Sequence, residues 1–354
     1  MTVPARPRLF ALVAATLLAG LLVAVPGAAR ACACGAAYVP NGHTVQAGDE
    51  LAFLSWAEPG IERLEMALSL TADTADLAVL VPTPSAPTVS QGDNATFDRL
   101  ATLTTPPPEA DEHGDGNGAG APQAAPSVLS RTVLDDVVAT VIKGGTPKGV
   151  ARWLARHGYA HKPQVTPVLA GYLQDGWVFT AVKLRADQPF DGQVDPLVLT
   201  FASQRLVYPM RLSLVASHVG TVTVYTLDRG YDRRSDRAGL AARPADALRT
   251  ITPDTYATGP LHTLAAAGNT KLAKFTYTDL DPASLTADFT FVADDRAQER
   301  ADAEQASAAH GELSHGSEGS DGPAPWLVGL IAFVVVLAVG GLGLVVGLRR
   351  SARR

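Results

Sequence analysis

Cysteine is nearly absent from this chain: only two occur among its 354 residues, Cys32 and Cys34. Because no other cysteine is available to pair with them, no framework of disulfides can hold the fold together, and stability must come from a buried core. Three interpretations of the pair remain open. The two cysteines could form a small local disulfide, Cys32 could carry a lipid, or both could serve metal or redox chemistry.

Standard catalytic signatures are also absent. The sequence has no G-x-S-x-G nucleophile motif, no H-E-x-x-H zinc motif and no glycine-rich loop of the phosphate-binding kind. We therefore name no catalytic, cofactor-binding or metal-binding residue and predict no cofactor. This absence favours a protein that is not an enzyme.

Two patterns come close to a metal site without meeting its requirements. His157 and His161 are four residues apart, but the glycine between them indicates a helix end, which would separate their side chains. Asp187, Asp191 and Asp195 are spaced more widely than the ligands of a calcium loop. Turns between strands explain these aspartates equally well.

Basic residues are scarce away from the two ends of the chain. Of the 29 lysines and arginines, seven lie in the first 30 or the last six residues, which leaves 22 against 35 acidic residues in between. A net charge near −13 on this middle part repels nucleic acid and anionic lipid surfaces. We therefore predict no nucleic-acid partner.

Residues 1–31 are predicted to be a signal peptide. Two arginines precede an uncharged apolar run at 9–25, and a Pro-Gly pair follows that run. Ala29 and Ala31 then place small residues where signal peptidase reads them. An uncleaved signal anchor is the alternative, because the apolar run is slightly long for a signal peptide.

Residues 326–348 are predicted to be a transmembrane helix. They carry no charge, and as a helix they span a hydrocarbon core of about 30 Å. The basic tail at 349–354 places the C-terminus in the cytoplasm. We expect a single-pass protein of the cell membrane, with an extracellular domain at 32–293 joined to the lipid bilayer by a flexible stalk at 294–325.

The middle of the chain alternates between strand patterns and turn residues. Residues 63–70 alternate apolar and polar side chains, as a half-buried strand does, and the apolar run at 75–82 is typical of a strand covered on both faces. Further strands are predicted at 133–142, 177–184, 196–202, 207–215, 219–227, 272–277 and 288–292.

Helical patterns are fewer. Asp93 can cap one short helix, Thr146 can cap a second that has proline in its first turn, and a third covers residues 260–267. Residues 104–127 are rich in Pro, Gly and Ala, which predicts a disordered loop. The predicted fold class is α+β: a mainly antiparallel β domain with a few helices, plus the C-terminal transmembrane helix.

Several strings together resemble an actinobacterial family of secreted, membrane-tethered proteins, domain of unknown function 2330. They are CACGA (32–36), LVPTPSAPTVSQGDNATFDRLATLTTP (80–106), ARWLARHGY (151–159), GWVFTAVKL (176–184) and DPLVLTFASQRLVYPMRLS (195–213). The resemblance covers roughly residues 32–290. It implies a location and an architecture but no catalytic residues.

The expected function is a non-catalytic binding or structural module of the cell envelope, with an envelope protein or a small molecule as its partner. A membrane-tethered hydrolase is the first alternative, and it would need a serine or an aspartate beside His218 or His262 in a pocket. A redox or copper-handling protein that uses Cys32 and Cys34 is the second alternative.

Overall fold

The structure is a computed structural model that describes residues 36–105, 127–134, 137–160, 163–216, 218–235 and 243–303. The predicted signal peptide, Cys32, Cys34, the predicted membrane helix and the basic tail lie outside these residues. So do most of the predicted loop at 104–127 and of the predicted stalk. Within the described ranges, no helix is both long enough and apolar enough to cross a membrane.

The largest sheet contains eight strands: β2 (Val45–Glu58), β3 (Ile61–Ala72), β5 (Thr88–Gln91), β9 (Asp191–Gln193), β10 (Leu197–Ala202), β12 (Val222–Asp228), β14 (Ala247–Thr250) and β15 (Lys271–Tyr277). Seven follow the order β14-β15-β12-β2-β3-β10-β5, and β9 pairs with β3. All of these pairings are antiparallel except that of β2 with β12. Glycine and turn residues join β2 to β3 in a long hairpin.

Two smaller sheets complete the strand content. Five strands follow the order β1-β4-β8-β7-β6, and three follow the order β11-β16-β13. Their bounds are β1 (Ala36–Tyr38), β4 (Asp76–Thr83), β6 (Ser127–Leu134), β7 (Val137–Lys143), β8 (Val178–Arg185), β11 (Leu206–Tyr208), β13 (Asp232–Arg234) and β16 (Phe289–Ala293). The fold is therefore mainly antiparallel β with several helices, as the sequence predicts.

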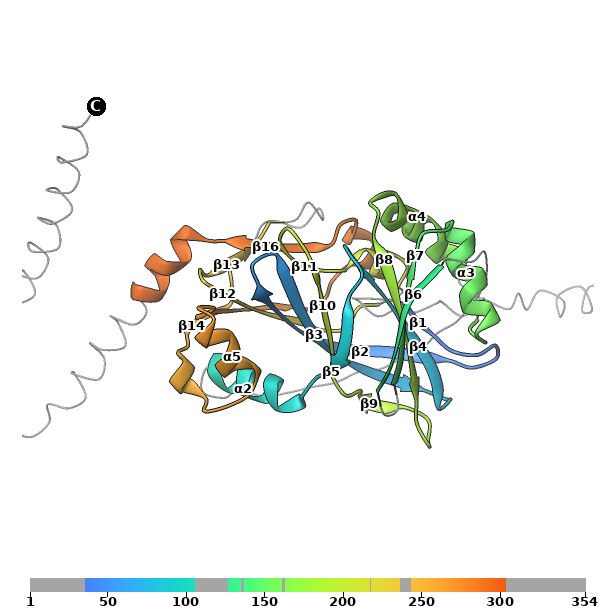
Figure 1. Ribbon diagram of the computed structural model, residues 1–354, viewed down its shortest axis with the longest axis horizontal. Coiled ribbons are helices and arrows are strands. Elements are labelled where there is room, and N and C mark those ends of the chain that lie inside the picture. The colour runs from blue at the N-terminus through green and yellow to red at the C-terminus, as the bar shows by residue number, and fades with distance from the viewer. Residues whose placement is uncertain are drawn as a thin grey trace, which may run out of the picture. The chain divides into compact units, whose positions relative to one another are not determined.

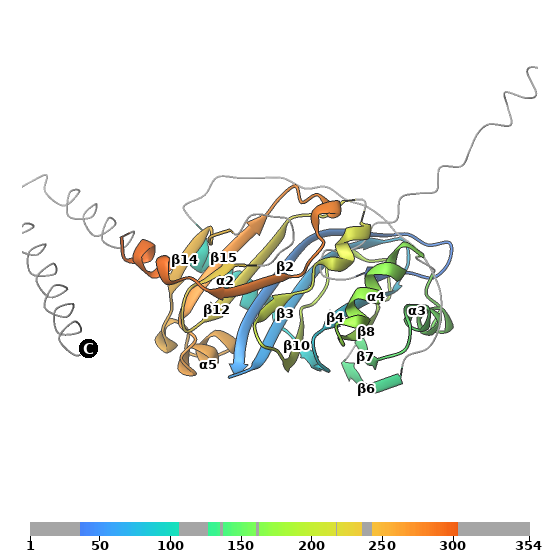
Figure 2. The same ribbon diagram turned by 90° about the horizontal axis from the view of Figure 1, so that it is seen from above.

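The helices lie on the outer faces of the two larger sheets (Figures 1 and 2). α3 (Pro147–Arg156) and α4 (Thr166–Gln174) pack on the five-stranded sheet. α2 (Asn94–Thr104) and α5 (Pro260–Ala266) pack on the eight-stranded sheet. Short 3-10 turns occur at η1 (Pro163–Val165), η2 (Arg211–Val215), η3 (Pro253–Thr255) and η4 (Pro282–Ser284). The inner faces of all three sheets share the main hydrophobic core.

β4 shows how the sequence produces these layers. Leu77, Val79 and Val81 enter the core between the sheets, whereas Ala78 and Leu80 face the core beneath α3 and α4. Successive strand side chains point to opposite faces, so a strand with both faces covered needs an unbroken apolar run. The prediction for residues 75–82 is confirmed.

β3 differs from the half-buried strand that its alternating pattern predicts. Glu65 and Ala67, on its supposed solvent face, are both buried. The Glu65 carboxylate pairs with Arg63 at 2.8 Å and accepts a hydrogen bond of 2.9 Å from the Asp93 amide at the start of α2. The polar side of β3 is therefore covered by α2. The buried Glu65 carboxylate binds the amide of Asp93, which caps this helix.

Three other segments differ from their predictions. The segment at 207–215 is a strand only as far as Tyr208, because Pro209 lacks an amide donor, and the 3-10 helix η2 follows. The segment at 133–142 belongs to two strands, β6 and β7, which pair as a hairpin. The sequence analysis did not predict α4.

Asp288, just before β16, is the acceptor at the centre of a buried hydrogen-bond cluster. Its carboxylate accepts from the Tyr172 hydroxyl at 2.5 Å, the Met210 amide at 2.8 Å, the Arg211 amide at 3.1 Å and the Arg211 side-chain Nε at 2.8 Å. The Arg211 guanidinium also lies 3.9 Å from the Tyr172 ring centroid and pairs with Asp175 at 2.6 Å. This Asp288 cluster ties α4, η2 and β16 together.

Candidate functional site

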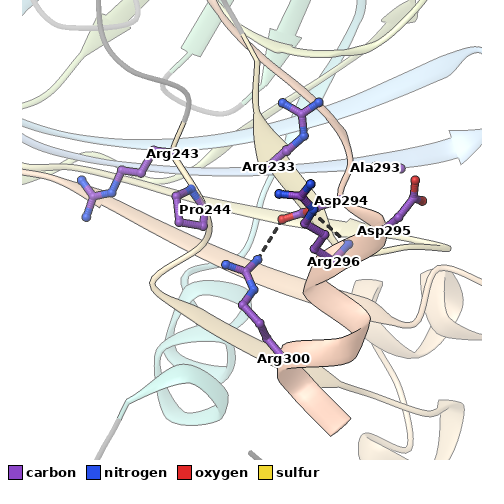
Figure 3. Close-up of a pocket in the computed structure, with 8 residues that line it drawn as sticks. All are labelled: Arg233, Arg243, Pro244, Ala293, Asp294, Asp295, Arg296 and Arg300. Carbon is purple, nitrogen blue, oxygen red and sulfur yellow. Dashed lines mark hydrogen bonds and ion pairs between the residues drawn. The ribbon is translucent and has the colours of Figure 1, made fainter. Parts of the chain in front are cut away.

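A cavity of about 610 Å³ lies where β16 ends and the following helical residues begin (Figure 3). Most of its lining side chains are charged. The four arginines are Arg233, Arg243, Arg296 and Arg300, and the two acidic residues are Asp294 and Asp295. We call this cavity the arginine pocket. Its lining carries a formal charge of +2 in a domain that is otherwise strongly acidic.

Arg233 reaches the pocket because of the alternation along β13. Its neighbours Asp232 and Arg234 are buried, whereas Arg233 is exposed. Since adjacent strand side chains point to opposite faces, Arg233 must face outward when its neighbours face inward. The register of Arg233 against Val292 on β16 brings it beside the residues that follow Ala293.

Arg296 and Arg300 reach the pocket from the helical residues that begin at position 295. They are four residues apart and therefore share one face of the helix, while Ala297 and Ala301 on another face are buried. Asp294 caps this helix: its carboxylate accepts from the Arg296 amide at 3.2 Å. Two small buried residues and one cap thus fix the orientation of two arginines.

The four guanidinium groups differ in their partners. Arg300 pairs with Asp294 at 2.8 Å, and Arg243 pairs with Asp246 at 2.6 Å and lies 5.2 Å from the Tyr277 ring centroid. Figure 3 shows Arg243 directed away from the other three arginines. The side chains of Arg233 and Arg296 make no hydrogen bond or ion pair with any described residue.

This arrangement suits an anion. Guanidinium groups keep their charge at any physiological pH and donate two parallel hydrogen bonds to a carboxylate or a phosphate. Arg233 on β13 and Arg296 on the following helical residues both carry a positive charge without a carboxylate partner among the described residues, so an anion bound between them would be stabilised by both. Within the described part of the chain, the lining contains no serine, cysteine, threonine, lysine or histidine, and its two carboxylates are those of Asp294, which pairs with Arg300, and Asp295.

A second cavity, of about 830 Å³, lies beside the irregular register between β2 and β3. Its lining includes Asp49, Ser69, Asp191, His218 and Asp279. A histidine therefore shares a pocket with serine and aspartate side chains, as the hydrolase alternative requires. Among the residues that the structure describes, however, none forms a hydrogen bond with the His218 ring.

The other histidines singled out from the sequence have structural partners or lie outside the described residues. The His262 Nδ1 atom lies 2.9 Å from the Pro253 carbonyl and 3.1 Å from the Tyr256 carbonyl. His157 ends α3 and stacks on Trp153 at 3.9 Å between ring centroids, while His161 is outside the described part. Across the described segments, no three His, Cys, Asp or Glu residues cluster closely enough to hold a metal ion.

Asp187, Asp191 and Asp195 do not converge on one point. Asp191 lies on β9 and accepts a hydrogen bond of 3.4 Å from Thr71, whereas Asp195 accepts one of 3.0 Å from Asn94 at the start of α2. Their contacts are with side chains of two different neighbours. The sequence interpretation as turn and strand-end residues therefore agrees with their places in the fold.

Asp232 on β13 is a buried carboxylate that faces the core and not the arginine pocket. It is 1% exposed, and its Oδ2 atom has no hydrogen-bond partner among the described residues. Burial raises the pKa of Asp232 to about 7; the nearby Thr226 hydroxyl opposes this rise, and the charge of Asp228 adds to it. Such a group titrates near neutral pH.

The sequence analysis did not identify the arginine pocket. Arg233 and Arg243 lie in the polar stretch between β12 and β14, and Arg296 and Arg300 lie at the start of the predicted stalk. Taken alone, each of these two pairs of arginines has the sequence pattern of solvent-exposed residues. The one available signal is the i, i+4 spacing of Arg296 and Arg300 beside two small alanines, which indicates a helix with a basic face.

Comparison with known families identifies the chain. It belongs to a bacterial family described as uncharacterized protein conserved in bacteria (DUF2330), whose model matches residues 28–292. The match includes β13 and most of β16 but ends before Asp294. No curated protein matches the sequence.

Solved structures that align with this chain include baculovirus P35. The match has 10% identity, covers 59% of this chain and 75% of that one, and gives a TM-score of 0.33. A mutated baculovirus P35 after caspase cleavage aligns with 10% identity over 57% of this chain and 76% of that one, with a TM-score of 0.30. No functional argument follows from similarity at this level.

Proposed function

We propose that this protein is a membrane-anchored, extracytoplasmic, non-catalytic binding module of the cell envelope, and that the arginine pocket is its ligand site. The observation that carries the proposal is a cavity with two unpaired guanidinium groups, in whose lining the carboxylate of Asp294 is already paired with Arg300 and that of Asp295 is turned away from the arginine side chains. A rigid β scaffold holds these groups through β13 and β16. Charged side chains that the fold holds in fixed orientations suit the binding of a ligand better than its chemical conversion.

The proposed location rests on the two apolar ends of the sequence. Protease added to intact cells that express the full chain is expected to digest the domain and to leave a small C-terminal fragment in the membrane. Immunoblotting against a C-terminal tag measures that fragment, with a cytoplasmic protein as the control for cell integrity. Complete protection of the domain would contradict the proposed topology.

Binding can be tested with isolated cell envelopes and the detergent-solubilised full chain. Each charge-assisted hydrogen bond contributes about 1.5–3 kcal/mol, so the double variant Arg233→Ala/Arg296→Ala is expected to bind envelopes at least about tenfold more weakly. Sedimentation of a dilution series measures the affinity.

The matched control is His218→Ala, in the other cavity. A membrane-tethered hydrolase is the second candidate function, because His218 shares its cavity with Ser69 and three aspartates. If His218→Ala abolished envelope binding while the arginine variant bound normally, the acidic cavity and not the arginine pocket would be the functional site.

A further inference from the structure

We propose that the arginine pocket recognises a doubly charged phosphate group, as in a phosphate monoester, with Arg233 and Arg296 as its direct ligands. This inference rests on the proposed function, since it takes the same pocket as the binding site. It names the chemical class of the ligand.

The four arginines of the pocket differ in whether an acidic residue already pairs with them. Asp294 holds Arg300 and Asp246 holds Arg243, so those two guanidinium groups are already compensated. Arg233 and Arg296 are exposed and have no carboxylate partner among the described residues. Figure 3 shows the Asp295 carboxylate turned away from the arginine side chains. Two positive charges therefore remain for a ligand to neutralise.

A phosphate group matches two guanidinium groups better than a carboxylate does. A guanidinium donates two parallel hydrogen bonds, and a single carboxylate offers one pair of oxygens that matches one such fork. A phosphate monoester has three terminal oxygens and carries a charge of about −1.5 to −2 at pH 7. It can therefore accept from two guanidinium groups at once, which one carboxylate does less well.

The size of the cavity also favours an ester. A volume of about 610 Å³ exceeds what an inorganic phosphate ion fills and lies within the usual range of about 300–1,000 Å³ for small-molecule sites. Room therefore remains for the alcohol part of an ester. No aromatic residue lines the cavity, so this part is expected to be polar, as in a phosphorylated polyol.

Two sources could supply such a phosphate: a soluble ester or the headgroup of an anionic lipid. The pocket lies next to residue 301, and about 25 residues separate that position from the predicted membrane helix. The net charge near −13 of the domain opposes its approach to an anionic lipid surface and favours a soluble ester, and the test distinguishes the two sources.

The test is calorimetric titration of the full chain with inorganic phosphate, glycerol 3-phosphate, sulfate and acetate at pH 7.5 and pH 5.5. We expect both phosphates to bind at least about tenfold more tightly than acetate at pH 7.5. Phosphate binding should weaken at pH 5.5, because the second pKa of phosphate is about 6, whereas sulfate binding should not change. Arginine does not titrate in this range.

Two variants test whether phosphate binds in the arginine pocket. Arg233→Ala/Arg296→Ala should weaken phosphate binding at least about tenfold, whereas Arg152→Ala, an exposed arginine on α3, should leave it unchanged. Sedimentation with vesicles of phosphatidylglycerol or phosphatidylcholine separates the sources. Binding to the anionic vesicles that the double variant loses identifies a lipid headgroup, and no vesicle binding identifies a soluble ester.

Failure of this inference differs from failure of the proposed function. Equal affinity for acetate and phosphate, or unchanged phosphate binding by the double variant, overturns the phosphate assignment even if envelopes still bind through the pocket. Phosphate binding without any envelope binding, or protection of the domain from external protease, instead overturns the proposed function and leaves the phosphate site standing.

Discussion

Replacing Asp288 with alanine is expected to lower the free energy of unfolding by about 3–5 kcal/mol, because it removes one partner of a buried ion pair. Asp288 accepts from Tyr172, Met210 and Arg211; the first two would lose this acceptor, and the Arg211 guanidinium would keep only the exposed Asp175. Burial, and then the charge of Asp288, raise the pKa of Tyr172 well above its ordinary value, so its hydroxyl remains a donor in the native state. A buried donor without an acceptor costs about 1–3 kcal/mol.

Asp175 provides the matched control. It pairs with the same Arg211 at 2.6 Å, but its side chain is 50% exposed. Exposed ion pairs contribute about 0–1 kcal/mol, so Asp175→Ala should have little effect. Denaturant unfolding followed by fluorescence suits the comparison, because Trp177 lies 5.0 Å from Tyr172 between ring centroids. Equal losses in the two variants would contradict the central role of Asp288.

The second large effect concerns pH. The pKa of Asp232 is about 7 in the folded protein and about 3.8 when the group is free in solution. Between these values the folded state holds a proton that the unfolded state releases, so folding stability falls as the pH rises from about 4 to about 7. At 1.36 kcal/mol for each pKa unit, the full loss is at most about 4 kcal/mol.

Asp232→Asn is expected to remove this pH dependence. The amide is neutral in both states, so the variant should match the wild type near pH 4 and exceed its free energy of unfolding by up to about 4 kcal/mol at pH 8. Denaturant unfolding at several pH values measures the difference. Asp98→Asn, an exposed position on α2, is the control and should leave the pH profile unchanged.

Glu62 makes a separate contribution of the same sign. Burial raises the pKa of this fully buried carboxyl well above its ordinary value, although the hydrogen bond of 2.9 Å from the Val207 amide opposes the rise. The Asp232→Asn variant should therefore retain part of the pH dependence, and the double variant with Glu62→Gln should be flatter. If the free energy of unfolding of Asp232→Asn varied with pH as it does in the wild type, Asp232 would have to be ionised in the folded core.

Much of the fold could be predicted because single residues control its local structure. Asp93 caps α2 through its side chain, accepting from the Ala95 amide at 2.9 Å, and Gly158 adopts a φ of 96° after α3. β4 was predictable from its unbroken apolar run. These features depend on residues that are close together in the sequence, so a local sequence pattern is enough to predict them.

The rest depends on contacts between distant segments. Glu65 looks like a solvent-facing residue until α2 covers it, and Glu62 is buried by the segment around Val207. The arginine pocket combines β13, the residues around Arg243 and those after β16, three segments that no local pattern relates. The sequence identified His218 as a candidate, but its surroundings emerge only from pairing between remote strands.

The parallel pairing of β2 with β12 constrains the time course of biosynthesis. Leu51 to Ser55 lie opposite Thr223 to Leu227, so the middle of the largest sheet remains open until some 170 further residues have been made. At about 5–20 residues per second, ribosomes need roughly 10–30 s for this. A nascent chain whose largest sheet cannot close early remains unfolded for that time, which is compatible with the export that we propose.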